Sequence, residues 1–375
     1  MSMQLSPSEP ANWRAAVPPE TSAPRVRMRF ITATPLNVAG GSGTFVGIKT
    51  LAAALRDAGV IVDILTPRLR LPIFTLQRLI FNQTLNRSMQ DRYDVTVGFD
   101  MDGYTLAGLG PSLHAASIKG VIADEMRFES GVTRATMQLQ AAFERRHVRS
   151  ADIVLTTSRY SSMRIRELYG LSTACRVVPE PIDLRQWRRL LHLARPRPET
   201  GKFVVLSVCR FYRRKRLDVL LKAAARLRRT IPELEVRIVG NGPQAHRLRA
   251  LHREKELDGT VVWLNEIPQL ELAQEYNRCD IFCLPSVQEG FGIVFLEAMA
   301  AGKPIVAARA GAAPEVVENG LLAEPESEEA LAEAIERLHR DHLLRKSLAD
   351  SGTRAVEQFD APHVARTFLR SVDVC

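Results

Sequence analysis

The sequence has few cysteines, few aromatic residues and no long apolar run, and each shortage excludes a class of protein. Its five cysteines are scattered and odd in number, so they suggest no disulfide framework, and no histidine cluster completes a zinc site. No window of about 18 residues is apolar and uncharged, so no transmembrane helix is predicted. Aromatic residues amount to 6% and do not alternate with basic ones, unlike single-strand nucleic-acid surfaces.

The N-terminus also lacks the apolar segment of a secretory signal. Residues 1–25 carry Ser, Pro and Glu instead, which predicts a disordered tail. The net charge of +9 attracts anionic small molecules, membrane surfaces or nucleic acid, but no nucleic-acid motif accompanies it. We therefore expect a cytoplasmic protein without a nucleic-acid partner. Its positive charge would allow peripheral contact with the inner face of the membrane.

The pattern of the chain predicts two α/β domains. Short apolar strands alternate with helices from residue 27 to 179, and the same alternation restarts at 203–208, which is typical of parallel sheets covered on both faces. The basic, proline-bearing stretch 185–200 lies between the two runs and is predicted to be a linker. We expect Rossmann-like domains over 26–190 and 191–360, and a C-terminal helix within 361–375 that returns to the first domain.

The most informative loop follows the predicted strand 281–285. Gly290 and Gly292 open directly into a helix, where backbone N–H groups and the helix dipole favour an anion. Glu289 precedes this loop and Glu297 lies more than one turn inside the helix. Carboxylates beside an anion site suit sugar hydroxyls, so the loop predicts binding of a polyol phosphate.

A second candidate site follows the predicted strand 203–208. Arg210 and Lys215 combine a guanidinium fork with an ammonium group, which suits a diphosphate. Arg213, Arg214 and Arg216 crowd the same stretch, so a solvated basic turn is the alternative. The neighbouring motif with Glu289, Gly290 and Gly292 favours the first interpretation, a diphosphate site.

Taken in order, these motifs resemble the donor domain of the family-four retaining glycosyltransferases of GT-B fold. The resemblance covers roughly Phe203 to Leu322. It implies two doubly wound domains facing a cleft, and a hexosyltransferase of polysaccharide biosynthesis that retains anomeric configuration. It further implies a UDP- or GDP-sugar donor, no metal or other cofactor, and a glycan, lipid or small-molecule acceptor. The matching segments are Arg210 with Lys215, 240–243, 280–286, Glu289 with Glu297, 300–304, 314–315 and 319–322.

The resemblance also implies roles for individual residues. It assigns the catalytic site to Glu289, Arg210 and Lys215, the last two holding the diphosphate. Glu297 would bind ribose, and the remaining donor-binding residues would be Gly40, Gly41, Gly290, Phe291, Gly292 and Ile267.

The glycines of the first domain allow a rival interpretation. Gly41, Gly43 and Gly47 loosely imitate a dinucleotide fingerprint, which would indicate an NAD-dependent oxidoreductase. The fit is poor, because 35–39 separates the strand from the glycines and the last gap is one residue too long. A non-catalytic sugar-nucleotide binder is the second alternative.

Acceptor-side residues are predicted at the end of the strand 115–119 and just after it. Family members often carry a histidine there, and our alignment places Lys119 at that position. Asp124 and Glu125 lie just downstream and would serve the acceptor hydroxyl, or form a solvated acidic turn. Asp100-Met-Asp102 has the spacing of a metal motif in a different glycosyltransferase fold, but we expect no metal there.

Residues 68–81 mix cations with large apolar side chains. Ile73, Leu76 and Ile80 make one helical stripe, which predicts a helix packed into the core. The alternative is an interfacial element that meets a lipid-bearing acceptor.

Overall fold

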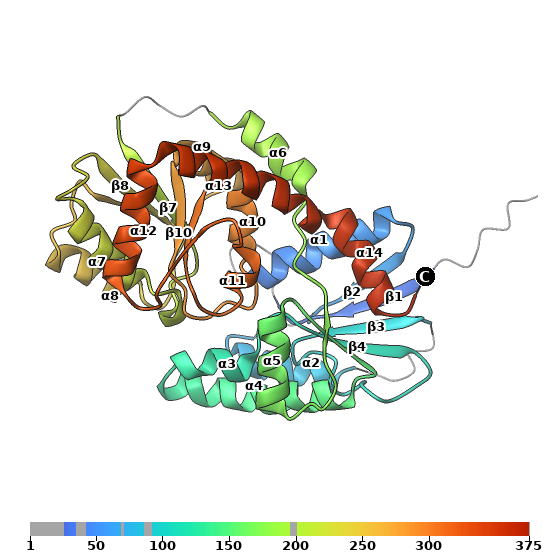
Figure 1. Cartoon of the computed structure of the whole chain (residues 1–375). Coiled ribbons are helices and arrows are strands. Elements are labelled where there is room, and N and C mark those ends of the chain that lie inside the picture. Colours follow the sequence, from blue (N-terminus) through green and yellow to red (C-terminus); the bar gives the residue numbers. More distant parts are fainter. Residues whose placement is uncertain (1–25, 35–42, 69–70, 86–91, 196–200, 375) are drawn as a thin grey trace, which may run out of the picture.

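The computed structural model describes residues 26–34, 43–68, 71–85, 92–195 and 201–374. They form two α/β domains, each built on a six-stranded parallel sheet (Figure 1). The predicted fold class is confirmed. Gly40 and Gly41, predicted to bind the donor, lie outside the described residues.

The first domain has the strand order β2-β1-β3-β4-β5-β6. The order reverses between β1 and β3, so the connections from these strands diverge and leave a crevice at their carboxyl ends. The strands are β1 (Arg27–Ile31), β2 (Ile61–Leu65), β3 (Val95–Phe99), β4 (Leu113–Ile118), β5 (Ile153–Thr156) and β6 (Arg176–Val177). The helices are α1 (Gly43–Asp57), α2 (Phe74–Gln83), α3 (Ile122–Glu125), α4 (Gly131–Ser150) and α5 (Arg159–Tyr169), with a 3-10 turn at Met126–Phe128.

The second domain has the order β12-β11-β10-β7-β8-β9, which reverses between β7 and β10. Apolar side chains bury both faces of this sheet, with Leu220 on one side and Phe295 on the other. Its strands are β7 (Phe203–Val208), β8 (Leu234–Val239), β9 (Val261–Leu264), β10 (Ile281–Leu284), β11 (Ile305–Ala308) and β12 (Leu321–Ala323). Its helices are η3 (Arg213–Lys215), α7 (Leu217–Leu227), α8 (Ala245–Glu254), α9 (Gln269–Arg278), α10 (Ile293–Ala300), α11 (Ala313–Val316), α12 (Glu328–Arg340), α13 (His342–Ala355) and η4 (Val356–Phe359).

Two further helices tie the domains together. Helix α6 (Leu184–Leu193) stands where the sequence predicts a linker, and Trp187 packs edge-on against Tyr276 of the second domain, with ring centroids 5.5 Å apart. Asp183 caps this helix by accepting a hydrogen bond from the backbone N–H of Gln186. Helix α14 (Ala361–Ser371) packs beside α1 of the first domain (Figure 1).

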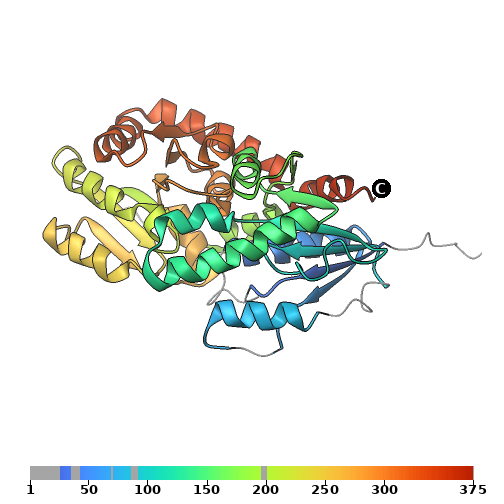
Figure 2. The same ribbon diagram turned by 90° about the horizontal axis from the view of Figure 1, so that it is seen from below.

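Helix α2 corrects one prediction. Ile73, Leu76 and Ile80, expected in the core, are 58%, 45% and 43% exposed. The inward face instead carries Phe81 together with Arg78 and Asn82, which hydrogen-bond to the buried Asp102. Figure 2 shows α2, in light blue, along the outside of the first domain. A buried ion pair, which the sequence does not reveal, therefore sets the orientation of this helix.

Candidate active site

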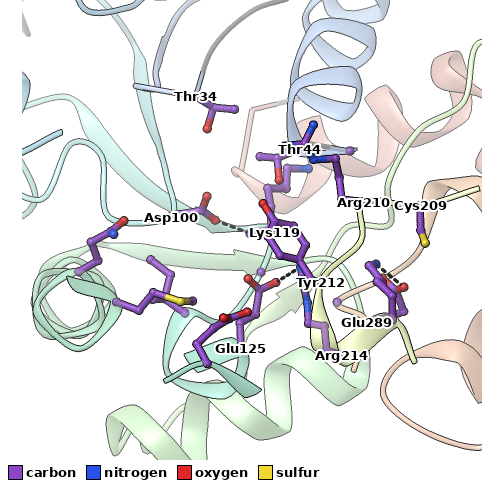
Figure 3. Close-up of a pocket in the computed structure, with 18 of the residues that line it drawn as sticks. Thr34, Thr44, Asp100, Lys119, Glu125, Cys209, Arg210, Tyr212, Arg214 and Glu289 are labelled. Atoms are coloured by element: carbon purple, nitrogen blue, oxygen red, sulfur yellow. Dashed lines mark hydrogen bonds and ion pairs between the residues drawn. The ribbon is translucent and has the colours of Figure 1, made fainter. Parts of the chain in front are cut away.

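A cavity of about 840 Å³ lies between the domains at the carboxyl ends of the sheets. Parallel α/β sheets bind ligands at the point where the strand order reverses. Here β7 and β10 lead into the cavity from the second domain, and β3 and β4 from the first. Figure 3 shows labelled side chains from both domains, among them Lys119 and Arg210, directed toward this space.

Lys215 and Glu289 meet at the second-domain wall of the cavity. Lys215 ends the tight turn after β7 and Glu289 follows β10, so the sheet brings them together from distant parts of the chain. The Lys215 Nζ to Glu289 Oε1 distance is 2.5 Å, and both side chains are largely buried. Burial pushes the pKa of Glu289 up, but Lys215 and Arg214 outweigh it and hold that pKa below its ordinary value. Glu289 is therefore an ionised hydrogen-bond acceptor.

The loop from Gly290 to Gly292 requires its glycines. A Cβ at residue 290 would lie 2.6 Å from the backbone oxygen of Lys119, across the domain boundary. Gly292 has φ of 94° and caps the N-terminus of α10. Phe291 is buried between them but lines the cavity. This loop therefore brings a helix N-terminus to the cavity wall, where an anion is favoured.

Glu297 and Ile267 are not among the residues that line the cavity. Glu297 lies on α10, where its Oε2 accepts a hydrogen bond from the Tyr276 hydroxyl at 3.0 Å. Burial raises the pKa of Glu297 to about 7. Ile267 packs, partly buried, against the core of the second domain. The structure thus sets both residues back from the cavity.

Arg210 lines the cavity, and Arg214 does so as well although the sequence analysis gave Arg214 no role. Arg210 Nη1 lies 2.6 Å from Glu266 Oε1 in an exposed pair. Arg214 is more buried, and its guanidinium reaches Gln288 Oε1 at 2.9 Å and Glu125 Oε1 at 3.1 Å. Arg214 directly precedes Lys215 in the turn after a strand, and this position in the sequence could have indicated that Arg214 lines the cavity.

The acceptor-side residues separate into two groups. Glu125 lines the cavity and pairs with Arg214 across the domain boundary. Asp124 does not line it; its buried carboxylate is engaged by Arg127, Arg164 and the Tyr160 hydroxyl. Asp124 therefore holds α3, the 3-10 turn that follows it and α5 together.

Lys119 lines the cavity together with two residues that the sequence analysis did not assign to it. Its Nζ lies 3.1 Å from Glu180 Oε2, and its backbone N–H donates to Asp100 Oδ1 at 2.9 Å. Nothing in the sequence pattern linked Glu180 to Lys119, which is 61 residues away.

Asp100 and Asp102 have different surroundings despite their close spacing. Asp102 is fully buried and accepts hydrogen bonds from Arg78, Asn82 and the backbone of Ala33. Asp100 lines the cavity instead. Among the described residues, no group of three or more His, Cys, Asp or Glu side chains is placed to hold a metal ion.

The fold and the cavity define a two-domain protein of GT-B architecture. Residues 192–355 match the family model of glycosyl transferases group 1. The second domain is a group 1 glycosyl transferase domain, and the resemblance inferred from its motifs is confirmed.

Two curated relatives carry different names. A GDP-mannose-dependent α-(1-6)-phosphatidylinositol monomannoside mannosyltransferase of Mycolicibacterium smegmatis is 33% identical over 226 residues, which are 57% of this chain and 59% of the relative. The match thus spans little more than half of that relative. A D-inositol 3-phosphate glycosyltransferase of Pseudarthrobacter chlorophenolicus is 26% identical and matches 86% of this chain and 88% of its own length.

Solved structures share the fold across nearly the whole chain. Sucrose-phosphate synthase from Thermosynechococcus elongatus has a TM-score of 0.78 at 22% identity, covering 92% of this chain and 98% of its own. The Anabaena protein HepE, solved with UDP and glucose, has a TM-score of 0.70 at 19% identity, covering 93% and 100%. None of the described helices has both the length and the apolarity needed to cross a membrane.

Proposed function

We propose that the protein transfers a hexose-type sugar from a UDP- or GDP-sugar to an acceptor hydroxyl on a glycan, a lipid-linked glycan or a small molecule, with retention of anomeric configuration. The observation that carries this proposal is the Lys215–Glu289 pair beside the N-terminus of α10, at the reversal point of the second sheet. This arrangement offers cations to a diphosphate and a carboxylate to sugar hydroxyls.

Each second-domain residue takes one role in this proposal. Arg210 and Lys215 stabilise the charge that develops on the leaving diphosphate, assisted by the backbone of 290–292 at the helix end. Glu289 accepts hydrogen bonds from the transferred sugar. Glu297 and Ile267 serve ribose and base, which requires the donor to reach past the present cavity wall. Gly40 and Gly41, which lie outside the described residues, are assigned to donor binding by the family resemblance alone.

The reaction proposed is a same-face displacement. The bond from the sugar C1 to the β-phosphate oxygen breaks, and the bond from the acceptor oxygen to C1 forms on the same face. The proton of the acceptor hydroxyl passes to the leaving phosphate oxygen, so no covalent enzyme nucleophile and no metal are needed. Lys119, Glu125 and Asp124 belong to the acceptor side, Asp124 by positioning α3.

The test is product analysis with purified protein. UDP-glucose and GDP-mannose are supplied with and without a chelator, and nucleoside diphosphate release is measured together with the anomeric configuration of the product by NMR. We expect release that survives the chelator, and a product with the donor's configuration. Tight binding of a sugar nucleotide without release would favour the non-catalytic binder, and binding of NAD alone would favour the oxidoreductase.

A further inference from the structure

Three charged side chains gather at the carboxyl end of the first sheet. Asp100 follows β3, Lys119 follows β4 and Glu180 follows β6, and all three line the cavity. They are 9%, 7% and 4% exposed, so their polar atoms reach almost nothing but the cavity. We refer to Asp100, Lys119 and Glu180 as the first-domain triad.

The triad has unused hydrogen-bonding capacity. Lys119 Nζ donates to Glu180 Oε2 at 3.1 Å, and the Lys119 backbone N–H donates to Asp100 Oδ1 at 2.9 Å. The other carboxylate oxygens, Asp100 Oδ2 and Glu180 Oε1, accept no hydrogen bond from any residue that the structure describes. The ammonium carries three N–H donors, of which Glu180 takes one. These atoms belong to residues that line the cavity, so they are available to a ligand that both donates and accepts.

The fold holds the triad in place at a conformational cost. Asp100 has φ of 53°, a left-handed conformation that non-glycine residues adopt at a cost of about 1 kcal/mol or more. Gly47 on α1 leaves room for the Glu180 carboxylate, because a Cβ there would lie 2.0 Å from Glu180 Oε2 and would displace that side chain. Strain and close packing of this kind concentrate at functional sites.

The charges of the triad select the class of ligand. One ammonium faces two carboxylates, so the group carries an excess of negative charge and disfavours an anion. Adjacent hydroxyls of a sugar each donate and accept, which matches the unused atoms. We propose that Asp100, Lys119 and Glu180 form a hydroxyl-binding site for a neutral sugar ring. The inference rests on the proposed function, and the ring is either the transferred sugar or the acceptor.

The variant for the test is Lys119→Met combined with Glu180→Gln. Removing both charges of the ion pair together leaves neither of its partners buried and unpaired, so the double variant is expected to fold. The matched control is Lys222→Met with Glu328→Gln, an ion pair of 3.6 Å on the outside of the second domain. Thermal melting of both variants checks that they remain folded.

Three readouts are compared between the wild type and the two variants. Saturation-transfer NMR measures contact with free glucose, mannose and inositol. Calorimetry measures affinity for UDP against UDP-glucose and UDP-glucuronate, and for GDP against GDP-mannose. Transfer assays measure the KM for a neutral acceptor. We expect the wild type to bind UDP-glucose at least tenfold more tightly than UDP-glucuronate, since the triad repels the carboxylate.

The expected loss depends on where the ring comes from. If the triad binds the transferred sugar, the double variant loses about tenfold in affinity for the sugar nucleotides and less than twofold for UDP and GDP. If it binds the acceptor, sugar-nucleotide affinity is kept and the acceptor KM rises about tenfold. In either case the NMR contact with free sugars falls, and the control variant matches the wild type.

Failure of the inference is distinct from failure of the proposed function. A folded double variant that matches the wild type in all three readouts overturns the hydroxyl site, as does an equal loss of affinity for free UDP and for UDP-glucose. A wild type that binds free sugars through the triad but no sugar nucleotide contradicts the proposed function and leaves the site standing.

Discussion

The two walls of the cavity are both rich in charge, but the chain builds them differently. The second-domain wall comes from two short segments, within 208–215 and 289–294, which are recognisable as motifs in the sequence. The first-domain wall draws on many separate segments, and its charged triad, Asp100, Lys119 and Glu180, comes from residues far apart along the chain. A site carried by contiguous loops is visible in the sequence, whereas a site assembled by strand order is visible only in the fold.

The ion pairs along the cavity also differ in how firmly they are held. Every cation that lines the cavity among the described residues pairs with a carboxylate. The Arg210–Glu266 pair is exposed, 38% and 43%, and such pairs are worth about 1 kcal/mol or less. The Lys119–Glu180 pair is buried, so breaking it is costly. Arg210 is therefore the cation that a diphosphate can take over most easily.

Among the substitutions that test the difference between the two walls, Lys215→Met is expected to have the largest effect on turnover. It removes a cation from the diphosphate site and leaves Glu289 buried without its partner. Turnover of the sugar nucleotide should fall about a thousandfold. Lys222→Met, on the outer surface of α7, is the control and should stay within twofold. Turnover of Lys215→Met within tenfold of the wild type would remove Lys215 from the mechanism.

A smaller effect is expected from Arg210→Ala. Turnover should fall about a hundredfold, because one donor to the developing charge is lost. The melting temperature should barely change, since the lost pair with Glu266 is exposed. Arg188→Ala breaks a comparable exposed pair with Glu357 and serves as the control for steady-state kinetics. Turnover near the wild-type value would refute the assigned role of Arg210.

The smallest effect concerns pH and Glu297. Burial raises the pKa of Glu297 from 4.5 to about 7, so between these values the folded protein keeps a proton that the unfolded chain has lost. The stability due to this proton falls as pH rises through that window. Glu297→Gln stays neutral and should melt about 3 °C above the wild type at pH 8, and at the same temperature at pH 4.5. An equal difference at both pH values would contradict the raised pKa.

Much of the fold was predictable because apolar strands and helices alternate regularly. The prediction matched β7 at both ends and β10 to within a residue. It failed at α2, where apolar periodicity indicated a core stripe but Arg78 had a buried partner in Asp102. Periodicity reports which residues can be buried, and a charged partner from another element decides which face turns inward.

The candidate site was predictable to different degrees on its two walls. Glu289, Arg210 and Lys215 follow strands, and Glu289 also precedes a glycine, so their positions at the cavity could be inferred from local pattern. Glu180 follows a two-residue strand in a stretch without a motif, and only its contact with Lys119 reveals it. Asp124 was predicted beside the acceptor, but neighbouring arginines draw its carboxylate away from the cavity.

The most direct test of the central claim is a crystal structure of the full chain with UDP or GDP bound. The account predicts the diphosphate at the N-terminus of α10, within hydrogen-bonding distance of Arg210 and Lys215, with the Arg210–Glu266 pair broken. A diphosphate seated at the N-terminus of α1, with Arg210 still paired to Glu266 and both cations turned from the ligand, would contradict it.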